Sequence, residues 1–285
     1  MKKNILIYII TIFFIYFTFI NQTLIVNAVI NSSLLFLTKV LPFFLPMYII
    51  SKILINYNFP VYISKLFNNN IYVYILLISF ISGSPNNAIL IKDLLNKNII
   101  TINEANKYIK CSFFQNPLFL YTMISNIFNN KIAIIIIISQ ILSNIILYLI
   151  KPIKSKYTNI IKSISLSDLL VKTINESINI LLYIYLSIVL FNIIIVLIPN
   201  SLSNFIGILE ITSGLNYLII SNNTILIKLL LTIIYISFGG LAIHLQIKSV
   251  LKDTNILYSN FLLSRFYQMI IMILFIIIQY ILFKP

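Results

Sequence analysis

The sequence predicts an all-α, polytopic membrane protein with about eight membrane segments. Sixty per cent of its 285 residues are hydrophobic and only 9% are charged, whereas about a quarter of the residues in a soluble domain are charged. The average hydropathy is strongly positive. The apolar residues also gather in runs of about 20, the length that an α-helix needs to cross the hydrocarbon core of a bilayer. We therefore expect the lipid bilayer to surround most of the chain.

The charged residues are mostly basic, with 20 lysine and arginine side chains against 6 acidic ones. They occur singly or in short clusters between apolar runs and form no basic stripe with interleaved aromatic residues, so nucleic acid is not an expected partner. Lysine-rich loops that face the cytoplasm and anionic lipid explain them better. Cys111 is the only cysteine, and no Cys/His pair has the spacing of metal ligands. We therefore expect no internal disulfide, metal or cofactor.

The candidates for the membrane segments are Ile5–Ile20, Leu24–Ile55, Ile71–Ile91, Ser112–Phe128, Ile132–Ile150, Ile178–Ile198, Ile225–Ile247 and Phe261–Phe283. The second segment is too long for one straight span, and Pro42 and Pro46 should bend or break it. Lys2 and Lys3 before an apolar run are typical of a signal sequence, and Val26–Ala28 loosely resembles a cleavage site. Because the downstream chain is also apolar, we favour an uncleaved helix over residues 1–22.

A polar segment divides the rest of the chain into two halves that look related. Residues 151–172 carry five lysines and are expected to form a cytoplasmic linker between residues 23–150 and 173–285. Each half contains an apolar half-helix, a break made of small residues, and a second half-helix that ends in lysine. These stretches are Phe80–Lys92 and Ile236–Lys248. The repeated break is the main support for the relation between the halves.

The distribution of lysines predicts that one segment turns back inside the membrane. With the N-terminus inside, Lys65 and Lys97 both lie on the cytoplasmic side. That placement requires Ile71–Leu95 to form a re-entrant hairpin that turns at Ser82–Pro85. The second half then begins in the orientation opposite to that of the first, which is the layout of an inverted repeat.

The break in the first half is the strongest functional signal. A broken helix survives at membrane depth only where protein or a water-filled cavity covers its exposed backbone groups, and in carriers such breaks point helix ends at the substrate. The alternative is a proline kink that serves packing, but the second break at Gly239 and Gly240 favours a substrate site. The candidate binding residues of the first half are Ser82, Gly83, Ser84, Pro85, Asn86, Asn87, Gln115 and Asn116. As an isolated motif before Pro117, the last two fit a helix cap better than a binding site, and they are candidates because they follow the first break closely in sequence.

Three further residues are candidates because polar groups are costly in a membrane. Glu210 lies in an apolar stretch and either faces a cavity or is an interfacial acid in a loop. Glu176 is a second acidic candidate, on the face of an apolar helix. His244 is the only histidine and either titrates during transport or hydrogen-bonds across helices. Solvated ion pairs in lysine-rich loops are expected for Asp93, Glu104 and Asp253.

Several motifs occur in the order seen in a known family. In the first half they are Leu41–Phe44, Ser82–Pro85, Lys92–Leu94, Ile102–Ala105 and Gln115–Phe119, and in the second half Gly207–Gly214 and Ser237–Gln246. With these motifs the chain resembles the YlbJ-type sporulation integral membrane proteins over nearly its whole length. The resemblance implies a Gate-type, nucleoside-recognition domain similar to parts of concentrative nucleoside carriers. It adds Thr212 and Gln246 to the candidate binding residues, and it implies movement of dipicolinate toward the developing spore, across the outer forespore membrane.

We therefore expect a transporter in the cell membrane that moves a small anionic or nucleoside-like solute by alternating access. No metalloprotease motif, phosphate loop or dinucleotide fingerprint occurs in the sequence, so no catalytic residue is expected. One rival is a non-transporting scaffold or assembly factor that contacts a second copy or other membrane proteins. A weaker rival is an intramembrane protease that pairs Ser82 or Ser84 with His244.

Overall fold

The computed structural model describes residues 2–153 and 163–282, and the chain is almost entirely α-helical in these ranges. No β-strand occurs in the described ranges, which confirms the all-α prediction. Five helical runs there are long and apolar enough to cross a membrane, namely Gln22–Asn56, Asn130–Leu149, Leu166–Val196, Ile225–Leu251 and Tyr258–Ile278. Shorter apolar helices of 10–17 residues lie within three other predicted segments, at Ile7–Ile20, Tyr72–Ser82 and Pro117–Ile127, and a further one is Ile211–Ile220. The count of eight membrane segments stays a prediction.

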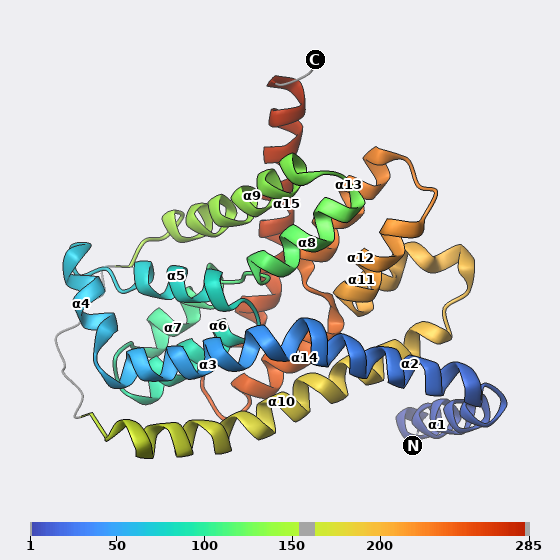
Figure 1. The fold of residues 1–285 in the computed structure, drawn as a ribbon, viewed down its shortest axis with the longest axis horizontal. Coiled ribbons are helices and arrows are strands. Elements are labelled where there is room, and N and C mark those ends of the chain that lie inside the picture. Colours follow the sequence, from blue (N-terminus) through green and yellow to red (C-terminus); the bar gives the residue numbers. More distant parts are fainter. Residues whose placement is uncertain (1, 154–162, 283–285) are drawn as a thin grey trace.

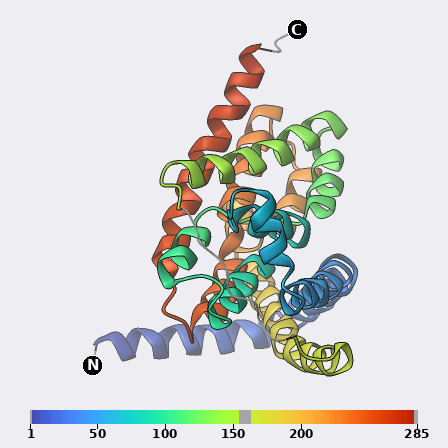
Figure 2. The same cartoon turned by 90° about the vertical axis from the view of Figure 1, so that its left-hand side faces the viewer.

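The first long run follows a separate N-terminal helix, α1 (Lys2–Ile20). It consists of α2 (Gln22–Leu35), a π-helical turn η1 (Phe36–Val40) and α3 (Leu41–Asn56). Neither proline breaks it: Pro42 lies in the first turn of α3, where a missing N–H is tolerated, and α3 continues through Pro46. The irregularity is the π-helical turn just before it. In Figure 2, α1 projects away from the other helices.

The second long helix, α10 (Leu166–Val196), packs along both α2 and α3 (Figure 1). It begins at Leu166, inside the segment 151–172 predicted as a linker and before the predicted membrane segment Ile178–Ile198. The physical reason is a helix cap: the Ser165 hydroxyl accepts a hydrogen bond from the backbone N–H of Asp168. The predicted linker residues 154–162 lie outside the described part of the chain.

The predicted turn at Ser82–Pro85 is present between two half-helices. After α4 (Phe59–Leu66) the chain forms α5 (Tyr72–Ser82) and α6 (Asn86–Asn96), which pack against each other. Gly83 between them has a φ of +71°, a value that glycine adopts without steric cost. The helices α5 and α6 therefore form a hairpin beside α4 and α7 (Ile102–Tyr108) (Figure 1).

The remaining helices include three further interruptions. After a turn that follows α7, residues 112–116 have no regular secondary structure and form the extended segment before α8, so the helix predicted over Ser112–Phe128 starts only at Pro117. The elements after this point are α8 (Pro117–Ile127), α9 (Asn130–Leu149), the 3₁₀-helix η2 (Asn200–Phe205) after α10, α11 (Ile206–Leu209), α12 (Ile211–Ile220), α13 (Ile225–Phe238), α14 (Gly240–Leu251) and α15 (Tyr258–Leu282). Glu210 separates α11 from α12, and Gly239 separates α13 from α14.

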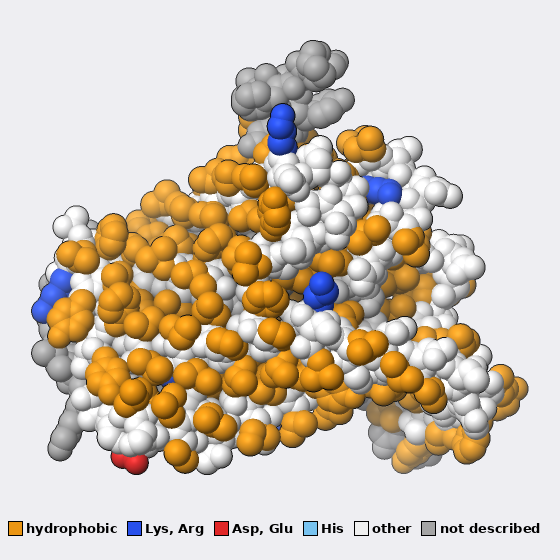
Figure 3. All heavy atoms as spheres, in the orientation of Figure 1, with side chains coloured by type: hydrophobic (Ala, Val, Ile, Leu, Met, Phe, Trp, Pro, Cys, Tyr) orange, Lys and Arg blue, Asp and Glu red, His pale blue; other side chains and the backbone are white. Residues whose placement is uncertain are grey.

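The outer surface is that of a multi-pass membrane protein. Hydrophobic side chains cover most of the face shown in Figure 3, and large apolar side chains on α1, α10 and α15 are exposed, among them Phe13, Leu186 and Leu274. Water-soluble monomers rarely expose apolar patches of more than a few hundred Å². Lipid is therefore the environment that this surface fits.

The hairpin of α5 and α6 predicts the sidedness of two loops. Cys111 is fully buried, so a thiol reagent should not label the native cysteine. In the Lys65→Cys and Lys97→Cys variants, we expect a membrane-impermeant thiol reagent to label both from the same side of the membrane. Asn200→Cys, at the start of η2 just beyond the far end of α10, should label from the opposite side. Labelling of Lys97→Cys together with Asn200→Cys would contradict the hairpin.

Candidate functional site

Four helix interruptions from distant parts of the chain meet in the interior. If Gly83 carried a side chain, its first carbon would lie 2.6 Å from the backbone nitrogen of Asn116. The same atom on Gly239 would lie 3.5 Å from Nε2 of Gln115, and on Gly240 it would lie 3.2 Å from the backbone nitrogen of Ile211, next to Glu210. The glycines therefore allow the backbones of the interruptions to approach closely.

A small cavity of about 80 Å³, here called the central cavity, lies at this meeting point. Eight of the residues predicted from the sequence line it: Ser82, Ser84, Pro85, Gln115, Asn116, Glu210, Thr212 and Gln246. They come from both halves of the chain. Ile184 and Ile188 of α10 and Phe43 and Phe44 of α3 supply apolar walls.

The other predicted residues lie behind the cavity wall or away from it. Asn86 and Asn87, in the first turn of α6, are buried, and Asn86 donates a hydrogen bond of 3.4 Å to the carbonyl of Phe44. His244 is also buried. Its ring nitrogens lie 2.7 Å from the Tyr258 hydroxyl and 2.9 Å from the Phe238 carbonyl. Of the two interpretations of His244, hydrogen bonding across helices is the one that the structure shows.

The arrangement required for a Ser–His protease is not formed among these residues. The hydroxyl of Ser82 donates to the carbonyl of Ile78 at 2.8 Å. Both nitrogens of His244 are engaged on α13 and α15, and the histidine does not line the central cavity. A serine nucleophile needs its base within hydrogen-bond reach, so the geometry gives this rival no support.

Glu210 is buried and caps a helix, so it is not an interfacial acid in an external loop. Its side chain is 3% exposed, and its two carboxylate oxygens accept hydrogen bonds from the backbone N–H groups of Thr212 (3.0 Å) and Ser213 (2.7 Å). These bonds satisfy two of the free N–H groups at the start of α12. The carboxylate also places a negative charge at the positive end of the helix dipole.

Several polar atoms around the central cavity have no hydrogen-bond partner within the described chain. They are the hydroxyl of Ser84, Nε2 of Gln115, Oδ1 of Asn86 and both amide atoms of Asn87. A buried polar group without a partner costs about 1–3 kcal/mol. A polar solute or water in the cavity would supply partners to those atoms that face it.

The extended segment before α8 is held by side chains that the sequence did not single out. The carbonyl of Cys111 accepts a hydrogen bond of 2.8 Å from the Tyr72 hydroxyl, and that of Phe113 accepts one of 2.7 Å from Asn144. Arg265 donates to the carbonyl of Lys110 at 3.1 Å. These bonds replace those that a helix would make, as irregular backbone inside a membrane protein requires. Polar residues such as Asn144 on otherwise apolar helices were the available signal.

Lys39 is the charged residue of the site that sequence reasoning missed. It lies in the π-helical turn η1 and lines the central cavity. π-Helical turns inside α-helices are frequent at functional sites. The signal was present, because Lys39 is the only charged residue between Lys3 and Lys52.

Larger cavities adjoin the central cavity on two sides. One of about 620 Å³, the α12 cavity, shares Lys39 and Thr212 with it and is lined mainly by α2, α10 and α12. The other, of about 420 Å³, is the α6 cavity, which shares Pro85, Ile184 and Gln246. The three cavities form a series along the helix pair of α2–α3 and α10, and the central cavity has the smallest volume of the three.

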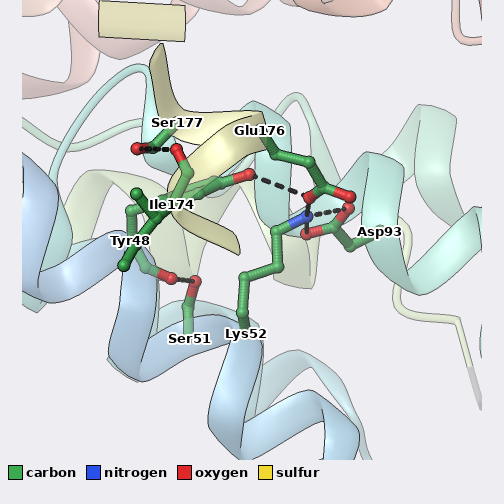
Figure 4. A network of polar contacts seen from close by, with 7 residues as sticks. All are labelled: Tyr48, Ser51, Lys52, Asp93, Ile174, Glu176 and Ser177. Atoms are coloured by element: carbon green, nitrogen blue, oxygen red, sulfur yellow. Dashed lines mark hydrogen bonds and ion pairs between the residues drawn. The ribbon is translucent and has the colours of Figure 1, made fainter. Parts of the chain in front are cut away.

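A network of charges lines the α6 cavity (Figure 4). Nζ of Lys52 on α3 lies 2.9 Å from Asp93 of α6 and 2.8 Å from Glu176 of α10. The Tyr48 hydroxyl donates to the same oxygen of Glu176 at 3.3 Å. Glu176 was one of the acidic candidates, and the structure gives it this role.

Two of the acids expected in solvated loops are instead structural. Asp93 lies inside α6, and its side chain is only 16% exposed, because the helix places it against α3. Glu104 caps α7 in a capping box with Thr101. Asp253 is 80% exposed and lies 4.0 Å from Lys92, so its expected solvated ion pair is confirmed.

The chain matches no protein-family model, no curated protein and no solved structure.

Gly83→Ala should destabilise the meeting point of the interruptions. The added methyl group meets the backbone of Asn116, and alanine at a φ of +71° is strained. We expect a loss of at least about 2 kcal/mol in the free energy of unfolding, measured by SDS titration in mixed micelles. Ser82→Ala, the neighbouring control, removes one local hydrogen bond and should cost less than about 1 kcal/mol. Equal effects of the two changes would contradict the close contact.

Lys52→Met should lower the free energy of unfolding more than the loss of a surface lysine does, because it leaves two carboxylates without their shared cation. We expect the free energy of unfolding to fall by about 3 kcal/mol in the same titration. For the exposed control Lys65→Met it should fall by less than about 0.5 kcal/mol. Adding Asp93→Asn to Lys52→Met should recover part of the loss. If the double variant is as unstable as the sum of its single changes, the two side chains are not coupled.

Proposed function

We propose that this chain is a membrane transporter that moves a small solute between the α12 cavity and the α6 cavity, through the central cavity. The observation that carries the proposal is the position of the narrow central cavity. It lies where four helix interruptions meet and has a larger cavity on each of two sides. Helix interruptions at membrane depth are typical of the substrate sites of secondary transporters.

The chemistry of the central cavity favours a small anion that accepts hydrogen bonds. Lys39 contributes a positive charge, and the amide nitrogen of Gln115 and the hydroxyl of Ser84 are free donors. The carboxylate of Glu210 is occupied by backbone N–H groups of α12. Dipicolinate, which the family resemblance implies, has this character. A nucleoside would use the amides without needing Lys39.

The size of the central cavity requires a conformational change during transport. Pockets that hold small ligands usually measure about 300–1,000 Å³, whereas the central cavity measures about 80 Å³. A solute therefore passes only when the half-helices around it separate. We propose that this narrow form is an occluded state between two states open to opposite sides.

The pattern of helix contacts supports two related halves. The half-helix α6 of the first half packs on α14 of the second, and α12 of the second half packs on α8 of the first. The last helices of the halves, α9 and α15, pair with each other, as do the long helices α2–α3 and α10. A two-fold rotation that exchanges the two halves would preserve this set of contacts. In transporters built from inverted repeats, such symmetry relates the states that open to opposite sides of the membrane.

Uptake by reconstituted vesicles tests the proposal. We expect saturable uptake of labelled dipicolinate or of a member of a nucleoside panel. Ser84→Ala and Glu210→Gln should reduce uptake at least tenfold. The first removes a hydroxyl that lines the central cavity, and the second replaces one of the two carboxylate oxygens that accept the N–H groups of α12. Lys39→Gln should do so only for an anion. The exposed lysine of α4 gives the matched control, Lys65→Gln, which should transport like the wild type.

Absence of uptake by well-folded protein would contradict the proposal and favour the scaffold alternative. Uptake that is unchanged in Ser84→Ala, Glu210→Gln and Lys39→Gln would leave a transporter but exclude the central cavity as its path.

A further inference from the structure

The only arginine of the chain is completely buried on α15. The side chain of Arg265 is 0% exposed, and its guanidinium carbon lies 4.2 Å from the ring centre of Phe113 and 4.9 Å from that of Phe261. It donates hydrogen bonds to Gln268, to the Ser264 hydroxyl and to the carbonyl of Lys110. It thus lies behind the extended segment that precedes α8, outside the cavities described above.

No carboxylate side chain of the protein is paired with Arg265. The chain has 6 acidic residues, all of them in the described ranges, and each has partners elsewhere. Asp93 and Glu176 contact Lys52, Glu104 contacts Thr101, Asp168 contacts Ser165, Glu210 contacts Thr212 and Ser213, and Asp253 contacts Lys92. The backbone carbonyl and the aromatic rings offset part of the cost of burying the guanidinium charge, but a buried charge without a counter-ion is strongly destabilising.

Polar atoms around Arg265 are also without partners. Gln268 of α15 donates to the hydroxyl of Ser143 on α9 at 3.1 Å, and within α9 Asn144 donates to the carbonyl of Gln140 at 3.0 Å. Among the side chains of α9, α15 and the segment before α8, three buried donors have no acceptor in the described residues: Nε of Arg265, Nε2 of Gln140 and the hydroxyl of Ser112. Two buried acceptors, Oε1 of Gln140 and Oδ1 of Asn144, have no donor there. Unsatisfied groups of this kind in a native interior indicate a small bound species, either water or an ion.

We propose that a small inorganic anion of the size of chloride binds beside Arg265, between α9, α15 and the segment before α8. Charge decides between an anion and water. Arg265 is a buried cation that no carboxylate side chain of the protein neutralises. The complete burial of Arg265 and Gln140 favours a small inorganic anion over an organic one. The bound anion neutralises Arg265 and accepts hydrogen bonds from its free donors.

Thermal unfolding of the full chain in detergent tests this site, with sodium chloride compared against sodium gluconate at constant ionic strength. Gluconate is too large for the cluster. We expect chloride to raise the melting temperature of the wild type saturably, by about 5 °C at a hundred times its dissociation constant. Arg265→Gln should abolish the difference between the two salts. Lys131→Gln, which removes an exposed lysine from the start of α9, should retain it.

A second variant keeps the test decisive if Arg265→Gln does not fold. Gln140→Leu keeps the arginine and removes one free donor, so the chloride concentration that gives half of the effect should rise at least tenfold. Two results would overturn the proposal: a wild type that melts at the same temperature in both salts, and a Gln140→Leu variant with an unchanged chloride midpoint. In either case water is the species that fills the cluster.

Discussion

The fold depends on satisfying backbone groups where helices are interrupted inside the membrane. A continuous helix satisfies its own N–H and carbonyl groups, but each of the four interruptions leaves several of them without partners in a region that lipid surrounds. Side chains supply the missing bonds. Glu210 accepts from the N–H groups of α12, Asn116 caps α8, and Tyr72 and Asn144 donate to the extended segment before α8. The interruptions lie together because each helps to shield the others.

The few charged side chains in the interior also satisfy or connect particular elements. Only 6 acidic residues are present, and those in the interior either cap a helix or connect two helices. Lys52 joins α3 to α6 and α10 through Asp93 and Glu176, directly beside a cavity of the proposed solute path. A charge pair in a low-dielectric interior is strong in its correct geometry and costly when it is broken. Movements of α6 against α10 will therefore favour discrete positions over a continuous range.

Much of the candidate site could be predicted from local signals. Gly83, Pro85 and Gly239 mark interruptions because only particular backbone conformations suit them, and acids such as Glu210 stand out against apolar surroundings. Pairings between distant residues could not be predicted. Lys52 is 41 residues from Asp93 and 124 from Glu176, and nothing in the local sequence specifies which acid meets which base. Asp93 was wrongly predicted to lie in a solvated loop. The helix α6 continues to Asn96, so Asp93 lies within it and faces the interior.

The π-helical turn η1 makes the chain sensitive to length at this point. A π-helical turn accommodates one more residue than an α-helical turn, so it rotates everything before it about the helix axis relative to everything after it. Ser33 before the turn contacts Tyr185 of α10, and Tyr48 after the turn contacts Glu176 of the same helix. Deletion of one residue within Phe36–Val40 would restore a regular helix and rotate one of these contacts about 100° away from α10. Evolution can therefore exchange the amino acids of this turn far more easily than it can change their number.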